Sequence, residues 1–190
     1  MNTQFKQKIR FDDRFAKIAA MGQIIFHAKD LANLWHIGNE NTLYTTLSRY
    51  VKKGLLFRAH KGLYAIKPID QIDPIILGIK ALRRFAYVSA ETALAHYGII
   101  QQETREITLV SDISKRFTIG PHHYRCRKLN DQYLHNTMGI IVKNGYKIAT
   151  VPRAVADLLY FNRNAHFDAK NVIDWKQVKI IQKQVYDSAK

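Results

Sequence analysis

The chain has 190 residues, of which 47% are apolar, and this composition supports a hydrophobic core and argues against a disordered protein. Thirty Lys and Arg residues against 15 Asp and Glu give a net charge of +15, which favours a polyanionic partner such as duplex DNA or RNA. Cys126 is the only cysteine, and no segment approaches the roughly 20 apolar residues of a membrane span, so we expect a cytoplasmic protein without disulfides or membrane contact.

The first third of the chain predicts a helix, a strand, two further helices joined by a turn, and a hairpin. Apolar residues at helical spacing mark the helices, and Gly22, Gly38 and Gly54 mark their ends. Lys61 and Gly62 suit the two-residue turn of the hairpin. The predicted ranges are 11–20 (helix), 23–26 (strand), 28–35 (helix), 39 or 41 to 53 (helix, with Asn39 or Asn41 as its cap), 55–60 (strand) and 63–66 (strand).

The third predicted helix has two contrasting faces. Its apolar stripe consists of Leu43, Leu47, Tyr50 and Val51. At 100° per residue, the opposite face carries the polar side chains of Asn41, Thr45, Ser48, Arg49 and Lys52, with Thr42 at its edge. Tyr44 lies between the two faces, and the spacing does not decide which of them it joins.

This order of elements is that of a winged helix-turn-helix, whose second helix of the pair lies in the major groove of DNA. Asn, Arg and Thr are side chains that contact base edges there, and the hairpin offers Arg58, His60 and Lys61 for phosphate or minor-groove contact. Residues 1–67 hold 12 basic and 4 acidic side chains, against 18 and 11 over residues 68–190. We therefore expect residues 1–67 to form a domain that binds duplex DNA.

A short polar linker between Pro68 and Pro74 precedes a second predicted domain, residues 74–190. Asn144-Gly145 between two β-branched runs is a strong hairpin signal, and Pro152 suits the first turn of a helix. Helices are predicted over 75–85, 90–97, 152–161 and 171–186, and strands over 107–110, 117–119, 124–129, 140–142 and 146–151. The predicted fold class is α+β: an N-terminal winged helix-turn-helix followed by a mixed α+β C-terminal domain.

Three blocks of sequence resemble the AbiEi-type antitoxins of abortive-infection systems. These blocks are residues 46–56 with 61–64, residues 87–94 with 97–99, and residues 151–157. The resemblance implies a type IV antitoxin that represses its own operon at an inverted repeat, with a possible homodimer on the DNA. It also implies a nucleotidyltransferase-like toxin as functional partner, which the C-terminal domain counters, typically without a stable complex.

Arg153 and Asp157 are four residues apart on a predicted helix, so the sequence predicts an ion pair on its surface. Within the resemblance, the same pair is a candidate contact surface for neutralising the toxin. The alternative is an ion pair on the helix surface that has no role in binding a partner.

We find no residue pattern typical of an active site and expect no enzyme activity, cofactor or metal. His122, His123, Cys126 and His135 match no standard zinc spacing. Glu91, Glu103, Glu106 and Asp112 are carboxylates of the kind that nucleases use, without a recognisable arrangement. Two alternatives remain open: a winged-helix repressor whose C-terminal domain dimerises or senses a signal, and a nuclease that the winged helix targets to DNA.

Overall fold

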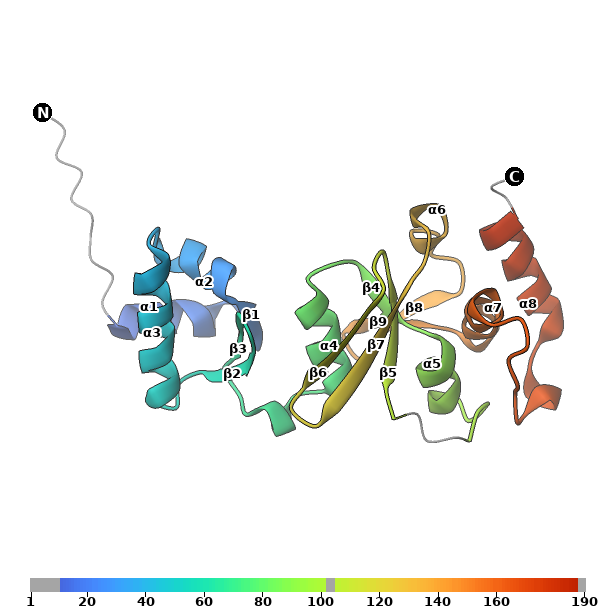
Figure 1. The fold of residues 1–190 in the computed structure, drawn as a ribbon, viewed down its shortest axis with the longest axis horizontal. Helices are drawn as coiled ribbons and strands as arrows, with labels where there is room; N and C mark the ends of the chain where they lie inside the picture. The colour runs from blue at the N-terminus through green and yellow to red at the C-terminus, as the bar shows by residue number, and fades with distance from the viewer. Residues whose placement is uncertain (1–10, 102–104, 188–190) are drawn as a thin grey trace, which may run out of the picture. The chain divides into compact units, whose positions relative to one another are not determined.

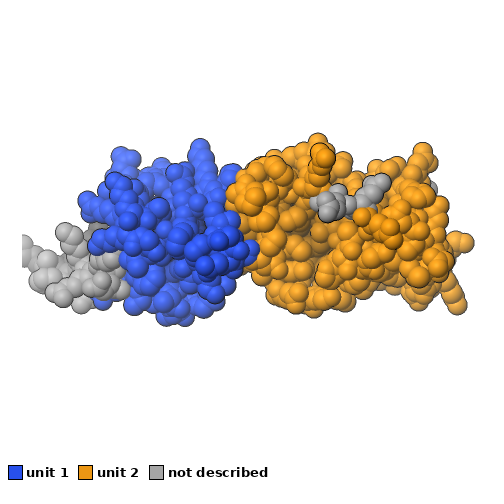
Figure 2. Space-filling view, turned by 90° about the horizontal axis from the view of Figure 1, so that it is seen from below, with its two compact units in different colours: residues 1–72 blue, residues 73–190 orange. Residues whose placement is uncertain are grey.

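The computed structural model describes residues 11–101 and 105–187. The chain is a mixed α+β protein that divides into two compact units, residues 1–72 (unit 1) and residues 73–190 (unit 2) (Figure 2). The division falls inside the polar linker, between the domain boundaries expected from the sequence at residues 67 and 74.

The described part of unit 1, residues 11–72, contains three α-helices and a three-stranded antiparallel sheet (Figure 1). The helices are α1 (Phe11–Ala20), α2 (Ala28–Trp35) and α3 (Glu40–Lys52), and the strands are β1 (Ile25–His27), β2 (Phe57–His60) and β3 (Leu63–Ala65). The sheet has the order β1-β3-β2, so the central strand β3 pairs with both of the others. All six predicted elements of this unit are present, with the strands shorter than the apolar runs suggested.

Local sequence explains where α3 begins and how the hairpin turns. Of the two candidate caps, Asn39 is the one used, because its side chain accepts a hydrogen bond from the backbone N–H of Thr42 at 3.0 Å. Gly62, in the β2–β3 turn, has a φ of +73°, a conformation that glycine adopts without steric cost.

The core of unit 1 lies between the helices and one face of the sheet. Trp35 of α2 stacks on Tyr50 of α3 with ring centroids 5.3 Å apart. Along α3 the stripe differs slightly from the predicted one, since Thr46 is buried whereas Val51 is only half-buried. Thr46 tolerates burial because its hydroxyl donates to the carbonyl of Thr42 at 2.8 Å.

Unit 2 is built on a six-stranded mixed sheet with the order β6-β7-β5-β4-β9-β8. The strands are β4 (Ala86–Val88), β5 (Ile107–Ser111), β6 (Lys115–Ile119), β7 (His122–Lys128), β8 (Ile140–Lys143) and β9 (Tyr146–Ala149). The pairs β4–β9 and β5–β7 are parallel, and the other three pairs are antiparallel. Asn144 and Gly145 both have positive φ and form the predicted β8–β9 turn.

Helices cover both faces of this sheet (Figure 1). On one face lies α4 (Pro74–Leu82), where a Cβ on Gly78 would come within 2.3 Å of the Tyr124 ring of β7, so glycine permits this close approach. The other face carries α5 (Ala90–His96) and α7 (Val151–Phe161), and α8 (Trp175–Ile181) packs on α7.

The C-terminal part of unit 2 departs from the sequence prediction. The single helix expected over 171–186 is divided into a 3-10 turn (Lys170–Val172), α8 and a π-helical segment (Gln182–Asp187). A short helix, α6 (Asp131–Leu134), was not expected, and the 3-10 turn η1 (Ile69–Gln71) occupies the linker. Among the described helices, none has both the length and the apolar character needed to cross a membrane.

Candidate nucleic-acid interface and a buried polar network

The side chains predicted to contact DNA are all exposed in unit 1. Six lie on α3 and three on the β2–β3 hairpin: Asn41, Thr42, Thr45, Ser48, Arg49, Lys52, Arg58, His60 and Lys61. On the opposite side of α3, Leu43, Leu47 and Tyr50 are buried in the core. The helix thus presents a polar and basic face, on which Glu40 is the acidic side chain, in the first turn.

Thr42 has a second role in this face. Its backbone N–H and its hydroxyl both donate to Asn39 Oδ1, the hydroxyl at 3.3 Å. Thr42 therefore belongs to the N-terminal cap of α3 as well as to the exposed surface, and its hydroxyl can offer a ligand its lone pairs but not its hydrogen.

The sequence left the side of Tyr44 undecided, and the structure shows that its side chain is 43% exposed. Phe26, Tyr64 and Arg58 stand opposite one another on the three strands, so they point to the same face of the sheet. Phe26 and Tyr64 belong to the core beneath the helices. Arg58 therefore leaves the hairpin on the side that the helices cover.

Arg58 stands opposite Tyr64 in the β2–β3 pair, and Tyr44 of α3 lies near enough to influence the Tyr64 hydroxyl. Burial raises the pKa of the Tyr64 hydroxyl, the nearby Arg58 partly lowers it, and Tyr44 raises it. We call Tyr44, Arg58 and Tyr64 the seam between α3 and the hairpin. Sequence periodicity did not reveal the seam, because it depends on the register between β2 and β3, which is shifted between Arg58 and His60.

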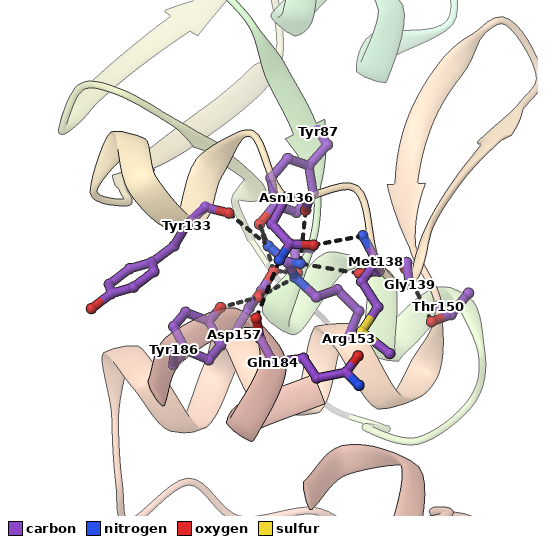
Figure 3. A network of polar contacts seen from close by, with 11 residues as sticks. Tyr87, Tyr133, Asn136, Met138, Gly139, Thr150, Arg153, Asp157, Gln184 and Tyr186 are labelled. Atoms are coloured by element: carbon purple, nitrogen blue, oxygen red, sulfur yellow. Dashed lines mark hydrogen bonds and ion pairs between the residues drawn. The ribbon is translucent and has the colours of Figure 1, made fainter. Parts of the chain in front are cut away.

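The second cluster of polar side chains lies inside unit 2, around Arg153 and Asp157 of α7 (Figure 3). The expected ion pair forms, with Arg153 Nε 2.7 Å from Asp157 Oδ1, but both side chains are completely buried. The prediction of a surface pair is therefore wrong, and in this structure neither residue is available as a toxin-contacting surface. The physical reason is that α7 is covered by α5 on one side and by α8 on another.

Asp157 accepts hydrogen bonds from four side chains. Tyr87 donates at 2.8 Å and Ser89 at 2.7 Å to one carboxylate oxygen, while Arg153 and Tyr186 donate to the other. These donors come from β4, the start of α5, α7 and the π-helical segment. Burial and the carboxylate of Asp157 both raise the pKa of Tyr87 and of Tyr186, so both phenols stay protonated and remain donors.

Most of the hydrogen bonds that the Arg153 guanidinium donates go to backbone carbonyls. Its guanidinium donates to the carbonyls of Asn136 and Met138, each at 3.0 Å, and of Tyr133 at 3.4 Å, as well as to the Tyr87 hydroxyl at 3.0 Å. Burial opposes its charge most strongly, but Asp157, Tyr87 and Tyr186 together outweigh burial and raise the pKa of Arg153. Arg153 thus fixes the segment between α6 and β8 through the backbone carbonyls that it binds, and it stays charged near neutral pH.

Tyr87, Ser89 and Tyr186 were not among the predicted site residues. Ser89 was expected to cap α5, yet its side chain makes no cap hydrogen bond. Its hydroxyl donates to the Asp157 carboxylate instead. One signal was available in the sequence: Arg153 and Asp157 are the charged residues of an otherwise apolar helix, and a helix that is apolar on all sides is usually buried.

Several of the side chains considered for zinc or nuclease chemistry have other partners in the structure. Cys126 is buried, its thiol donates to the Ile113 carbonyl at 3.4 Å, and burial raises its pKa to about 11. Three of the candidate carboxylates pair with arginines, namely Glu91 with Arg127, Glu106 with Arg116 and Asp112 with Arg84, whereas Glu103 lies outside the described residues. Within residues 11–101 and 105–187, no three His, Cys, Asp or Glu side chains are grouped as metal ligands.

Comparison with known proteins gives a structural likeness only. No family model matches the chain, and no curated protein matches its sequence. Among solved structures, the chain is similar to the crystal structure of the RV2827C protein from Mycobacterium tuberculosis, with a TM-score of 0.52 and 13% sequence identity. The match covers 92% of this chain and 71% of that chain, and at this identity it shows a shared α+β fold alone.

Proposed function

We propose that the protein is a DNA-binding transcriptional regulator whose unit 1 is a winged helix-turn-helix. In this proposal α2 and α3 form the helix-turn-helix, α3 enters the major groove, and the β2–β3 hairpin is the wing. The observation that carries the proposal is the exposure of all nine predicted contact residues on α3 and the hairpin, while the opposite side of α3 is buried.

The chemistry of this surface suits duplex DNA. Asn41 can pair with adenine through two hydrogen bonds, and Arg49 with guanine. Lys52 follows Arg49 in the last turn of α3, where phosphate contact is as favourable as base contact. On the hairpin, Arg58 and Lys61 add positive charge for phosphates or the minor groove.

A single winged helix contacts one half-site, so we propose that two copies occupy an inverted repeat in the operator of the protein's own gene. The further proposal of a type IV antitoxin, which counters a nucleotidyltransferase-like toxin, rests on the sequence resemblance to the AbiEi-type proteins. Its neutralising surface lies elsewhere than at Arg153 and Asp157, because both side chains are buried.

Binding to the DNA upstream of the protein's own reading frame tests the regulator proposal. The wild-type protein should bind this duplex more tightly than a shuffled duplex of equal length and should repress a reporter joined to it. The Arg49→Ala/Lys52→Ala variant should lose both effects. Its matched control is Lys176→Ala/Lys179→Ala, which removes two exposed charges from α8 and should behave as wild type. Equal affinity of wild type for both duplexes would overturn the proposal.

Toxin neutralisation requires a separate experiment, in which the neighbouring toxin gene is expressed from an unrelated promoter. Cells carrying the folded Arg49→Ala/Lys52→Ala variant should survive as well as cells carrying the wild-type protein, because the neutralising surface is proposed to lie in unit 2. Death of these cells, with the variant abundant and folded, would remove the antitoxin role and leave a simple repressor.

A further inference from the structure

Tyr160 of α7 lines two neighbouring hollows in unit 2. One has a volume of about 420 Å³ and is lined by Ala156, Leu159, Tyr160, Arg163, Gln182 and Tyr186. The other has a volume of about 410 Å³ and is lined by Asp112, Lys128, Asn130, Asp131 and Tyr160. Hollows of this size fall within the range of small-ligand sites, roughly 300–1,000 Å³, and the Tyr160 ring lines both of them.

The Tyr160 ring is exposed, and contacts with two other tyrosine rings fix its orientation. Its side chain is 45% exposed. It stacks on Tyr186 with centroids 4.8 Å apart and planes 16° from parallel, and Tyr133 contacts it edge-on at 5.8 Å. Tyr186 is in turn held by its hydrogen bond to the buried Asp157. The buried network of Figure 3 therefore fixes the ring on which Tyr160 rests, so a ligand that stacks on Tyr160 need not order it first.

Each hollow carries one cation. Arg163 lines the first and Lys128 the second, both side chains are exposed, and within the described part of the chain neither makes an ion pair. In the second hollow, Asp112 is already engaged by Arg84, and Asn130 accepts the backbone N–H of Gln132 as the cap of α6. The groups left for a ligand include the Tyr160 ring, the two cations and the exposed carboxylate of Asp131.

We infer that this site, the Tyr160 platform, binds a nucleotide unit, either free or within single-stranded nucleic acid. The base stacks on Tyr160, because every base has a π-face and aromatic side chains are its usual platform. The phosphate lies against Arg163 in the hollow without carboxylates, and Asp131 accepts a hydrogen bond from an amino group of the base. A duplex does not fit this arrangement, because its bases are stacked on one another and cannot reach the ring.

A protein partner is the competing occupant, since Tyr and Arg are also the side chains that dominate protein interfaces. Two features favour the nucleotide. The surface consists of two hollows that each fit a small ligand, where a protein interface needs a broad patch. Tyr160 belongs to both hollows, with Arg163 in one and Lys128 in the other. This alternation of positive charge and aromatic ring matches the alternation of phosphates and bases along a single strand.

The test measures binding of a fluorescent single-stranded RNA to the full chain, and calorimetry with AMP or GMP separates a strand from a free nucleotide. Tyr160→Ala should weaken binding by at least about fivefold, the lower end of what one stacked base contributes. Tyr160→Phe retains the ring and should bind as wild type. Arg163→Ala removes an exposed side chain, leaves the fold intact and should also weaken binding, whereas Lys143→Ala on β8, the edge strand opposite to the β6–β7 side of the sheet, should not.

The platform is independent of the proposed duplex binding, and two tyrosines of similar exposure separate them. Tyr160→Ala should leave duplex binding unchanged, and Tyr44→Ala in unit 1 should leave single-strand binding unchanged. Failure of the wild-type protein to bind either the single strand or the nucleotides would overturn the platform, as would equal binding by wild type and Arg163→Ala. Capture of a protein by Tyr160 and Arg163 without nucleotide binding would assign the surface to a protein partner and also overturn it.

Discussion

Arg153 Nε donates to Asp157 Oδ1 across 2.7 Å, and neither side chain has any exposed surface. A buried ion pair of this kind is costly to break, because the remaining charge cannot recover its hydration. The pair is therefore a structural element of unit 2, whose removal affects stability before it affects any contact with a partner.

Arg153→Met should lower the free energy of unfolding of unit 2 by about 3–5 kcal/mol, since it leaves the Asp157 carboxylate buried without its cation. The Arg153→Met/Asp157→Leu double variant should recover only the part of this loss that comes from the unpaired charge, because Tyr87, Ser89 and Tyr186 then lack their acceptor. Urea unfolding followed by the fluorescence of Trp175 reports on unit 2, with Trp35 replaced by Phe in all proteins compared. A single variant as stable as its parent would mean that the pair is not buried in solution.

Leu47→Ala and Arg49→Ala should have opposite consequences although they lie two residues apart. Leu47 is completely buried, so its truncation should destabilise unit 1 by about 2–5 kcal/mol. Arg49 is exposed, so Arg49→Ala should change stability by less than about 0.5 kcal/mol while it weakens DNA binding. Thermal unfolding and duplex titration of both variants check this, and an Arg49→Ala protein that unfolds early would contradict the assignment of the two faces.

Duplex binding should weaken steeply with salt. About five phosphate contacts from α3 and the hairpin would give a slope of about −4 to −5 for log affinity against log salt concentration. Lys61→Ala, at the tip of the hairpin, should make this slope shallower by about 0.9. Titrations over a series of salt concentrations measure both values. An affinity that does not change with salt would argue against phosphate contact altogether.

Tyr44→Phe should weaken duplex binding by about 1.5–3 kcal/mol if the hydroxyl donates to a phosphate between the grooves that α3 and the hairpin enter. Its salt slope should stay that of wild type, because a neutral donor displaces no counterion. Arg58→Ala, at the other side of the seam, should weaken binding and make the slope shallower. Equal affinities of wild type and Tyr44→Phe would place this hydroxyl outside the interface.

Cys126 should react slowly with iodoacetamide in the folded protein. The thiolate is the reactive form, and a pKa of about 11 in place of 9.0 leaves roughly 100-fold less thiolate at pH 8. Denaturant should restore the rate of an ordinary thiol. Mass spectrometry of samples quenched over time measures both rates, and rapid labelling without denaturant would show that unit 2 opens around β7.

The elements of unit 1 were predictable because each has a local signal. Helical spacing of Leu43, Leu47 and Tyr50 is independent of the rest of the chain, and so are the cap at Asn39 and the glycine of the hairpin turn. The seam was not predictable, because Tyr44 and Arg58 lie on different elements and only the strand register brings Arg58 beside Tyr64.

In unit 2 the sequence indicated most strands and helices but not which strands pair or which helices pack together. The parallel pairing of β5 with β7 and of β4 with β9 joins strands that other elements separate, and no local pattern encodes such pairing. The same limit explains the error at Arg153 and Asp157. Their spacing predicts the ion pair, whereas their burial depends on α5 and α8, which pack on α7 from elsewhere in the chain.

The division at residue 72 has a consequence for synthesis of the protein. Unit 1 makes its core from residues before the division, so it can fold as soon as they leave the ribosome. The hydrogen bonds of Asp157 instead need Tyr186, which is synthesised 114 residues after position 72. At translation rates of about 5–20 residues per second, this interval lasts about 6–23 seconds. A nascent chain therefore exposes a finished unit 1 while the interior of unit 2 still lacks its last hydrogen-bond donor.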